Sequence, residues 1–188
     1  MSYKNIDQLQ LEQNSNLIKV NFKLRPWKFE DKFALQKYAN NPKIASKMTD
    51  GFPHPYNLED AEKFITFATE MNPISIFAIT IEDEAVGGIG IHLESDIHRL
   101  NAELGYWLAE NYWGKGIVSK AIQEIVAYGF ENFEITRIYA RPFGSNVASQ
   151  KVLEKAGFQF ETKFEKTLIK NGVLEDEYYF SICKSKKK

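Results

Sequence analysis

The sequence predicts a mixed α/β domain built on one sheet of six or seven strands. Apolar and polar residues alternate over residues 17–25, which is the two-residue period of a half-buried strand. Apolar residues recur at helical spacing over residues 58–71 and again over residues 116–130. Strand-like segments lie between these helical stretches, and this mixture is typical of a sheet covered by helices. A chain of 188 residues is long enough for one such domain.

The first part of the chain is expected to form a strand followed by two helices. Pro26 ends the strand over residues 17–25, because proline cannot donate a hydrogen bond to a sheet ladder. Helices are expected over residues 30–40 and 58–71. Asn57 can cap the second helix.

The segment between these helices, residues 49–56, is expected to be a loop. Gly51, Pro53 and Pro55 fall within it and disfavour both helix and strand. Loops of this kind often line binding sites. Its residues are therefore candidates for contact with a substrate.

Three strands are expected next, over residues 74–81, 85–93 and 102–109. Short polar turns separate them, so they should pair antiparallel. The helix over residues 116–130 then leads to a strand over residues 135–140. This strand should lie parallel to the strand that precedes the helix, with a right-handed crossover.

The last part of the chain predicts a hairpin of two strands, over residues 160–169 and 173–182. Asn171 and Gly172 join these strands, and both residue types accept the positive φ angles that a tight hairpin turn requires. The hairpin completes the predicted sheet.

Composition places the chain among ordinary globular proteins, with 44% hydrophobic, 14% aromatic and 26% charged residues. The formal net charge of -1 provides no overall attraction to nucleic acid or an anionic membrane. No apolar run approaches the roughly 20 residues of a membrane helix, and the N-terminus lacks the features of a secretion signal. We expect a cytoplasmic protein with its domain over residues 17–184, an N-terminal extension over residues 1–16 and a basic tail over residues 185–188.

The most informative segment is the turn that precedes the helix over residues 116–130. Gly114 and Gly116 flank Lys115, so the backbone carries no large side chains where the first N–H groups of the helix lack partners. These donors, the helix dipole and the Lys115 ammonium together can bind a pyrophosphate. Taken alone, the same residues are equally well explained as a flexible turn.

A second informative segment, residues 141–158, carries clear signals for the start and end of a helix. Ser145 or Asn146 can cap the start. Gly157 stands where a left-handed C-terminal residue is expected, and Phe158 follows it. A further helix is therefore expected within this segment.

Several motifs of the chain agree with one another, and they are ELGYWL at residues 103–108, WGKGIV at residues 113–118, NVAS at residues 146–149 and EKAGF at residues 154–158. In these motifs the chain resembles the GNAT superfamily of N-acetyltransferases. Within it, the chain is similar to the RimJ/RimL-type branch, which acetylates protein N-termini and related amines. The segments LRPW at residues 24–27 and DGFPHPYNLEDAEKFI at residues 50–65 extend the resemblance to the N-terminal half.

The resemblance implies a GNAT-like acyl-CoA acyltransferase fold, in which a mixed six- to seven-stranded sheet has helices on both faces. Its two central parallel strands splay apart, and the pantetheine arm of acetyl-CoA, the implied cosubstrate, enters the gap. The backbone of residues 106–109 would hydrogen-bond the pantetheine, and N–H groups of residues 113–118 would hold the pyrophosphate. The implied cofactor-binding residues are Tyr106, Trp107, Leu108, Trp113, Gly114, Lys115, Gly116, Ile117, Val118 and Asn146.

Two of these positions depart from the usual superfamily pattern, and a third has two explanations. Trp113 stands where the superfamily usually has Gln or Arg, but tryptophan there is familiar in the RimJ/RimL branch. Val118 replaces the last small residue of the turn and still presents its backbone N–H. Asn146 is explained equally well as a plain helix cap or as a residue that also contacts the cofactor.

An amine must lose its proton before it can attack, because an ammonium has no lone pair. α-Amino groups release the proton near pH 8, and lysine side chains release it nearer pH 10. Glu103 matches a glutamate that family members use as a base, directly or through water. The alternatives are an exposed carboxylate without function or one that only attracts cationic substrates.

The departing coenzyme A thiolate needs a proton or a hydrogen bond. Many GNAT enzymes use a tyrosine of the later helix, but the matching position here is Leu153. Ser149 lies one helical turn earlier on the same face, as in the RimJ/RimL branch, and is the expected donor. The alternative for Ser149 is local capping of the helix. Leu108 or its neighbour would direct an amide at the thioester carbonyl.

Phe52, His54 and Tyr56 are the expected acceptor-side residues, although His54 is also explained as an ordinary loop histidine. The three histidines show no metal-binding spacing, so no metal is expected. The lone cysteine, Cys183, lies far from the motifs. Direct attack in a ternary complex, without a covalent acyl-enzyme, is therefore expected.

The leading hypothesis is an acetyl-CoA-dependent N-acetyltransferase that acts on a primary amine, either a protein N-terminus or a small amine such as a polyamine, amino acid or aminoglycoside. The alternative is a non-enzymatic acetyl-CoA-binding or sensor module of the same fold, which the presence of Glu103 and Ser149 disfavours. A P-loop phosphotransferase is disfavoured because the turn lacks the length and the Lys-Ser/Thr ending of that motif. A homodimer is compatible with the sequence, which does not determine the oligomeric state.

Overall fold

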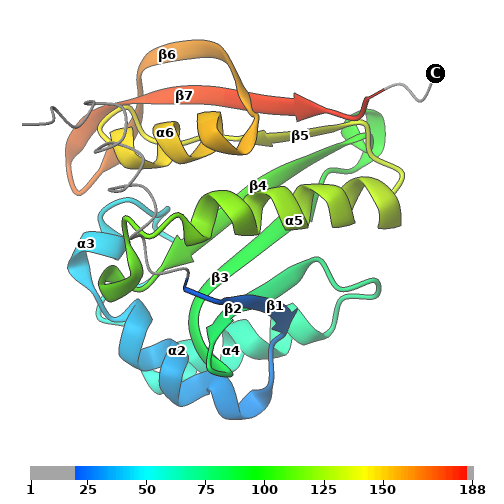
Figure 1. Ribbon diagram of the computed structural model, residues 1–188. Helices are drawn as coiled ribbons and strands as arrows, with labels where there is room; N and C mark the ends of the chain where they lie inside the picture. The colour runs from blue at the N-terminus through cyan, green and yellow to red at the C-terminus, as the bar shows by residue number, and fades with distance from the viewer. Residues whose placement is uncertain (1–19, 186–188) are drawn as a thin grey trace, which may run out of the picture.

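The computed structural model describes residues 20–185, in which seven strands form one mixed sheet with helices on both faces (Figure 1). The strands lie in the order β1-β2-β3-β4-β5-β7-β6. All neighbouring pairs are antiparallel except β4 and β5, which are parallel. The predicted fold class is confirmed. The bounds are β1 Lys23–Pro26, β2 Ile76–Ile81, β3 Glu84–Leu93, β4 Asn101–Leu108, β5 Arg137–Ala140, β6 Gln159–Lys170 and β7 Val173–Cys183.

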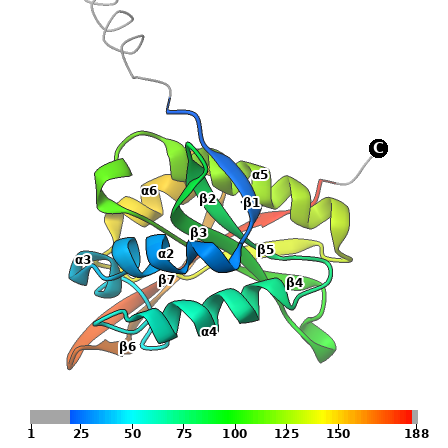
Figure 2. The ribbon, with the colours of Figure 1, turned by 90° about the horizontal axis from the view of Figure 1, so that it is seen from below.

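Two helices, α2 (Lys32–Ala39) and α4 (Leu58–Thr69), pack against one face of the N-terminal half of the sheet (Figures 1 and 2). Their buried residues form a cluster with Trp27 and with Trp107 of β4. The short helix α3 (Pro42–Ala45) follows α2.

Two further helices, α5 (Ile117–Asn132) and α6 (Val147–Ala156), pack against the opposite face. Their apolar side chains meet those of β3, β4 and β5 in a larger cluster that contains Ile89, Ile122 and Leu153. The amphipathic pattern of residues 116–130 therefore predicted the buried face of α5 correctly, because Ala121, Ile122, Ile125 and Val126 are all buried there.

The helix caps follow the local sequence chemistry. Asn57 accepts a hydrogen bond from the Asp60 N–H at 2.9 Å, and the Asp60 carboxylate accepts one from the Asn57 N–H at 3.0 Å. Asn146 accepts from the Ser149 N–H at 3.2 Å and so caps α6. At the end of α6, Gly157 has φ +101° and the Phe158 N–H bonds to the Leu153 carbonyl at 3.0 Å.

The hairpin between β6 and β7 is also confirmed. Asn171 and Gly172 have φ angles of +51° and +77°, and they connect Lys170 to Val173, which face each other across the ladder. The antiparallel order of β2, β3 and β4 and the parallel pairing of β4 with β5 agree with the prediction as well.

Two features differ from the prediction. β1 is shorter than the expected strand over residues 17–25, because it pairs only with Phe77–Thr80 of β2. Residues 20–22 are not in the strand, and the rest of that range, the expected N-terminal extension and residues 186–188 lie outside the described residues. Helix α3 was not expected, although Asn41 caps it and Pro42 opens it.

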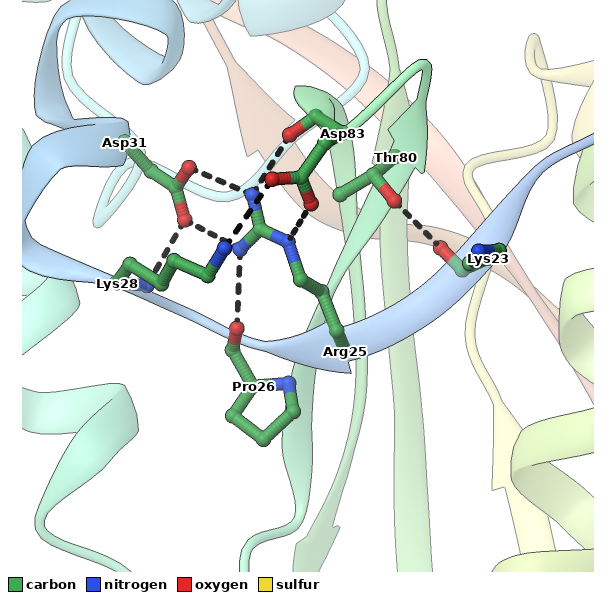
Figure 3. Close-up of polar contacts among 7 residues, drawn as sticks. All are labelled: Lys23, Arg25, Pro26, Lys28, Asp31, Thr80 and Asp83. Carbon is green, nitrogen blue, oxygen red and sulfur yellow. Dashed lines mark hydrogen bonds and ion pairs between the residues drawn. The ribbon is translucent and has the colours of Figure 1, made fainter.

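A cluster of charges around Arg25 joins β1 to the start of α2 and to the turn between β2 and β3 (Figure 3). The Arg25 guanidinium donates two hydrogen bonds to Asp31, at 2.7 and 2.8 Å, and one to the Asp83 carboxylate at 2.9 Å. Asp31 is buried, and Lys28 donates its backbone N–H to the same carboxylate at 2.8 Å. The cluster fixes the edge of the sheet.

No helix within residues 20–185 has both the length and the hydropathy needed to cross a bilayer.

Candidate active site

The central parallel strands, β4 and β5, separate after a short paired stretch. They pair only at residues 101–103 of β4 and 137–139 of β5, although β4 continues to Leu108. On its other side β4 stays paired with β3 as far as Leu108, opposite Gly87. The two strands therefore splay, as the resemblance implies, and leave one edge of β4 open within the described chain.

The register shows which backbone groups of β4 face this gap. The Ala109 N–H donates to the Val86 carbonyl at 2.8 Å, so every second residue back from Ala109 directs its backbone groups toward β3. Tyr106 and Leu108 direct theirs toward the gap. This corrects the expectation for residues 106–109, because the backbone groups of Trp107 and the Ala109 N–H face β3 and are not available to a ligand in the gap.

The carbonyl of Leu108 already has a partner, because the Trp113 indole N–H donates to it at 2.7 Å. This bond ties the end of β4 to the glycine turn. The groups that remain for a ligand at this edge are the N–H and carbonyl of Tyr106 and the N–H of Leu108. They offer the donors and acceptor that an extended amide chain such as pantetheine requires.

The glycine turn opens directly into α5. Gly114 and Gly116 have φ angles of +73° and +72°, and a Cβ atom on either would have no neighbour within 4 Å. Gly116 is the residue that precedes the helix, and no side chain caps the first turn. The first N–H groups of α5 therefore face open space at the positive end of the helix dipole. The Lys115 ammonium lies 5.1 Å from the centre of the Tyr112 ring.

On the other side of the gap, the start of α6 brings Ser149 to the hydroxyl of Tyr106. Their oxygens are 2.6 Å apart. Asn146 uses its side chain to cap the helix, while Leu153 is fully buried. The plain capping role of Asn146 is therefore confirmed, and its contact with a cofactor stays a prediction.

Glu103 lies where β4 and β5 begin to separate, and it is not a free carboxylate. The Arg141 guanidinium donates to both of its oxygens, at 2.9 and 2.8 Å. A second carboxylate, Glu177 of β7, lies 3.5 Å from the same guanidinium. Hydrogen bonding to Glu103 raises the pKa of Arg141, so the guanidinium is always charged. Each Glu103 oxygen keeps one acceptor site for a substrate amine or a water molecule.

The acceptor loop, residues 49–56, packs against Trp107 of β4 through Phe52. The Phe52 ring contacts the rings of Tyr56 and Trp107, with centroids 5.1 and 6.1 Å away. His54 is exposed, whereas Tyr56 is only 4% exposed and belongs to the core, where burial raises its pKa to about 12. Phe52 is half-buried and His54 is exposed, so their acceptor-side role stays a prediction, whereas Tyr56 would have to leave the core to contact an acceptor.

The loop is also tied to the far side of the gap. The Lys170 ammonium, at the end of β6, donates to the Asp50 carboxylate at 2.8 Å. The Lys47 ammonium donates to the Ser145 hydroxyl, just before α6, at 2.8 Å. Asp50 therefore ties the loop to the β6–β7 hairpin, and Lys47, just before the loop, contacts the segment that leads into α6.

The fold thus brings Glu103, Tyr106, Leu108 and Ser149 together around one gap, with the glycine turn at its end. Three groups were missed from the sequence: the Tyr106 hydroxyl, Arg141 and Glu177. Arg141 follows a predicted strand by one residue, and this position was the only signal for it. Cys183 is exposed at the end of β7, which borders β5. Residues 20–185 contain no group of three or more histidine, cysteine or acidic side chains that could hold a metal.

A family model described as "Acetyltransferase (GNAT) domain" matches residues 21–159. The chain therefore belongs to the GNAT family of acetyltransferases, and it is an N-acetyltransferase. An uncharacterized N-acetyltransferase p20 of Bacillus licheniformis is 31% identical over 86% of this chain and 92% of its own length. The ribosomal-protein-serine acetyltransferase of Escherichia coli is 30% identical over 54% of this chain and 56% of its own length.

Among solved structures, the microcin C7 self-immunity acetyltransferase MccE, crystallised with acetyl-CoA and AMP, is 28% identical. It superposes with a TM-score of 0.72, covering 89% of this chain and 95% of that one. The likeness therefore extends over most of the fold.

Proposed function

We propose that this enzyme transfers the acetyl group of acetyl-CoA to a primary amine by direct attack, and that its preferred acceptor is the α-amino group of a protein or peptide. The observation that carries the proposal is the gap between β4 and β5, which has the open backbone edge of Tyr106 and Leu108 on one side and Glu103 at its closed end. The complex of the similar MccE with acetyl-CoA supports the choice of cosubstrate.

The residues of the gap suit acetyl-CoA in three ways. The open edge of β4 can bind the amides of the pantetheine arm. The free N–H groups at the start of α5 can bind the diphosphate, because Gly114 and Gly116 leave the approach clear. The Leu108 N–H can stabilise the oxyanion that develops on the thioester carbonyl when the amine attacks.

Glu103 can act as the general base for the attacking amine. Its carboxylate can accept a proton from the attacking ammonium, directly or through water, while Arg141 holds it in one orientation. Glu177 adds a second negative charge beside the same guanidinium, so the three groups carry a net charge of about -1. A cationic amine is attracted to this group.

The choice of an α-amino acceptor rests on proton affinity and on likeness. With pKa values near 8 and 10.4, the neutral fraction of an α-amine at pH 7 exceeds that of a lysine side chain by roughly 200-fold. An α-amine therefore depends less on a general base, and here the candidate base, Glu103, is already paired with Arg141. The name of the Escherichia coli relative, a ribosomal-protein-serine acetyltransferase, supports the same acceptor class.

The test is a turnover assay in which free thiol is measured after acetyl-CoA is mixed with matched acceptors. The panel contains a peptide with a free N-terminus, the same peptide with a blocked N-terminus and one free lysine, and spermidine. We expect thiol release to be at least tenfold faster with the free N-terminus. Tight binding of acetyl-CoA with no turnover on any acceptor would instead support the binding-module alternative, and preference for spermidine would overturn the acceptor assignment.

The cofactor turn has its own matched pair of variants. Gly116→Ala places a Cβ at φ +72° where the diphosphate would lie, and Gly172→Ala introduces the same backbone strain in the β6–β7 turn, at φ +77°. We expect the first to raise the KM for acetyl-CoA by more than about tenfold and the second to leave it unchanged. Equal KM values in both variants would contradict the placement of the diphosphate.

A further inference from the structure

The contact between Tyr106 and Ser149 is the shortest link across the gap. Tyr106 belongs to β4 and Ser149 to α6, 43 residues further along the chain, and their hydroxyl oxygens are 2.6 Å apart. The one other contact recorded for the Tyr106 hydroxyl is with the Ser149 carbonyl, at 3.5 Å. The described chain therefore directs this phenol at a single residue.

Tyr106 lies on a different element from the tyrosine that many GNAT enzymes use. The resemblance would place a tyrosine in the later helix, at the position of Leu153, whose side chain is buried in the core here. Tyr106 comes from the opposite side of the gap, and its own backbone faces that gap. A phenol is thus present beside Ser149, but it comes from a different element.

Either hydroxyl can be the donor in this bond, and the two directions have different consequences for a ligand in the gap. A serine hydroxyl has one proton to donate. If Ser149 gave that proton to Tyr106, nothing would remain for a ligand in the gap. If Tyr106 donates to the Ser149 oxygen, the serine proton stays free, and the Ser149 hydroxyl can donate to a ligand atom such as sulfur.

Proton affinity argues against Tyr106 as the acid that protonates the departing thiolate. Burial raises the pKa of Tyr106 to about 12, and the hydrogen bond with Ser149 opposes this only in part. A thiol has a pKa of about 8.5. Transfer of the phenolic proton to a thiolate is therefore unfavourable, so Tyr106 remains a hydrogen-bond donor and is not the acid.

We propose that Tyr106 is a positioning residue whose hydroxyl orients the Ser149 hydroxyl toward the departing sulfur of coenzyme A. This inference rests on the proposed function and adds the group that orients the donor. When the C–S bond breaks, its electron pair goes to sulfur, and Ser149 donates a hydrogen bond to the thiolate without losing its proton. The thiolate takes a proton from water after release, and the proton of the amine leaves through Glu103.

The first test is a double-mutant cycle with Tyr106→Phe, Ser149→Ala and the double variant. Phenylalanine keeps the ring and removes only the hydroxyl. We expect Tyr106→Phe to lower kcat about tenfold and to change the KM for acetyl-CoA less than about twofold, as the loss of one hydrogen bond predicts. In the Ser149→Ala background, the same change should have almost no effect, because the two groups act in series.

A matched control is available in Tyr128→Phe. The Tyr128 hydroxyl, on α5, donates to the Ile74 carbonyl just before β2 at 2.7 Å, and its ring packs against those of Phe77 and Phe133. This variant also loses one tyrosine hydrogen bond, but its kcat should match that of the wild type. An equal loss of kcat in Tyr128→Phe and Tyr106→Phe would overturn the proposal, since it would reflect stability alone.

The second test measures the thiol of bound coenzyme A and does not need turnover. The ultraviolet absorbance of the thiolate, followed against pH, gives the pKa of that thiol. We expect the pKa to be lower when coenzyme A is bound to the wild type and to rise by about one unit in Tyr106→Phe, the equivalent of a tenfold effect. An unchanged thiol pKa, or additive effects on kcat in the cycle, would contradict the positioning role.

The two tests separate this proposal from the proposed function. Absence of turnover by the wild type on every amine, together with the expected thiol pKa shift, would reject the enzymatic proposal and keep the Tyr106–Ser149 pair. Normal turnover with no effect of Tyr106→Phe on either readout would keep the enzyme and reject the pair.

Discussion

Arg25 and Arg141 each donate two hydrogen bonds to one carboxylate, but only the second pair lies at the gap between β4 and β5. The distances are 2.7 and 2.8 Å for Arg25 with Asp31, and 2.9 and 2.8 Å for Arg141 with Glu103. The Asp31 side chain is 9% exposed, whereas that of Glu103 is 29% exposed. The same chemical pair is therefore enclosed at the sheet edge and open at the gap.

Each guanidinium also has a second acidic partner. For these second partners the order of exposure is reversed. Asp83, beside Arg25, is 71% exposed, whereas Glu177, beside Arg141, is 13% exposed. At the sheet edge, the buried carboxylate accepts three hydrogen bonds, two from Arg25 and one from the Lys28 N–H (Figure 3). At the gap, the accessible carboxylate retains acceptor sites. The first pair is suited to holding elements together, and the second is suited to meeting a substrate.

The comparison predicts the largest effect at Glu103. Glu103→Gln keeps the size of the side chain and removes the base, so kcat should fall about 100-fold at neutral pH. The loss should be greatest at low pH, where the amine is protonated, and smaller near pH 8 and above. A pH–rate profile with the preferred amine measures this.

Glu161→Gln provides the control, because Glu161 is paired with Arg137 in the same way but on β6, at the edge of the sheet. Its pH–rate profile should match that of the wild type. A wild-type profile for Glu103→Gln would remove Glu103 from the base role.

The next effect is on stability, at the sheet edge. Arg25→Ala leaves the buried Asp31 without its guanidinium and should lower the free energy of unfolding by about 2 kcal/mol. Urea denaturation measures the change. The kcat of the folded fraction should stay within about twofold of the wild type, since Arg25 does not border the gap. A loss of kcat without a loss of stability would mean that the two pairs do not have separate roles.

A smaller effect is expected for Arg141→Lys. Lysine keeps the charge but cannot donate in the planar, two-pronged manner of arginine, so Glu103 loses its fixed orientation. We expect kcat/KM for the amine to fall about tenfold, with little change in the KM for acetyl-CoA. If the KM for acetyl-CoA rose instead, Arg141 would belong to the cofactor side of the gap.

The smallest expected effect is on the acid dependence of stability in the variant Asp83→Asn. Hydrogen bonds from Lys28 and Arg25 lower the pKa of Asp83 below its ordinary value of 3.8. A carboxylate of this kind stabilises the fold fully above its unfolded pKa, and the contribution disappears as the pH falls through the lower folded pKa. Asp83→Asn should therefore be slightly less stable than the wild type at pH 6, and the difference should disappear as the pH falls well below 3.8. A difference that grows in acid would contradict this sign.

Local chemistry made much of the fold predictable. Asn57, Asn146 and Gly157 mark helix ends through bonds to residues only a few positions away, and Asn171 with Gly172 forms its turn without distant partners. The turn around Gly116 was predictable for the same reason. Fold class followed from these signals together with the period of the apolar residues.

The pairs at the gap could not be predicted in this way. Arg141 meets Glu103 across 38 residues and Tyr106 meets Ser149 across 43, and both contacts depend on where β4 stops pairing with β5. The orientation of the Trp107 backbone likewise depends on the register with β3, since a shift of one residue reverses it. Spacing in the sequence contains no such information.

The most direct test of the whole account is hydrogen–deuterium exchange of the backbone amides with and without coenzyme A. If the cofactor lies along the open edge of β4 and against the start of α5, the amides of Tyr106, Leu108 and residues 114–118 should become protected. The amide of Trp107, already bonded to β3, should change little. Protection confined to other segments, or none at saturating coenzyme A, would contradict the placement of the cofactor and with it the assigned chemistry.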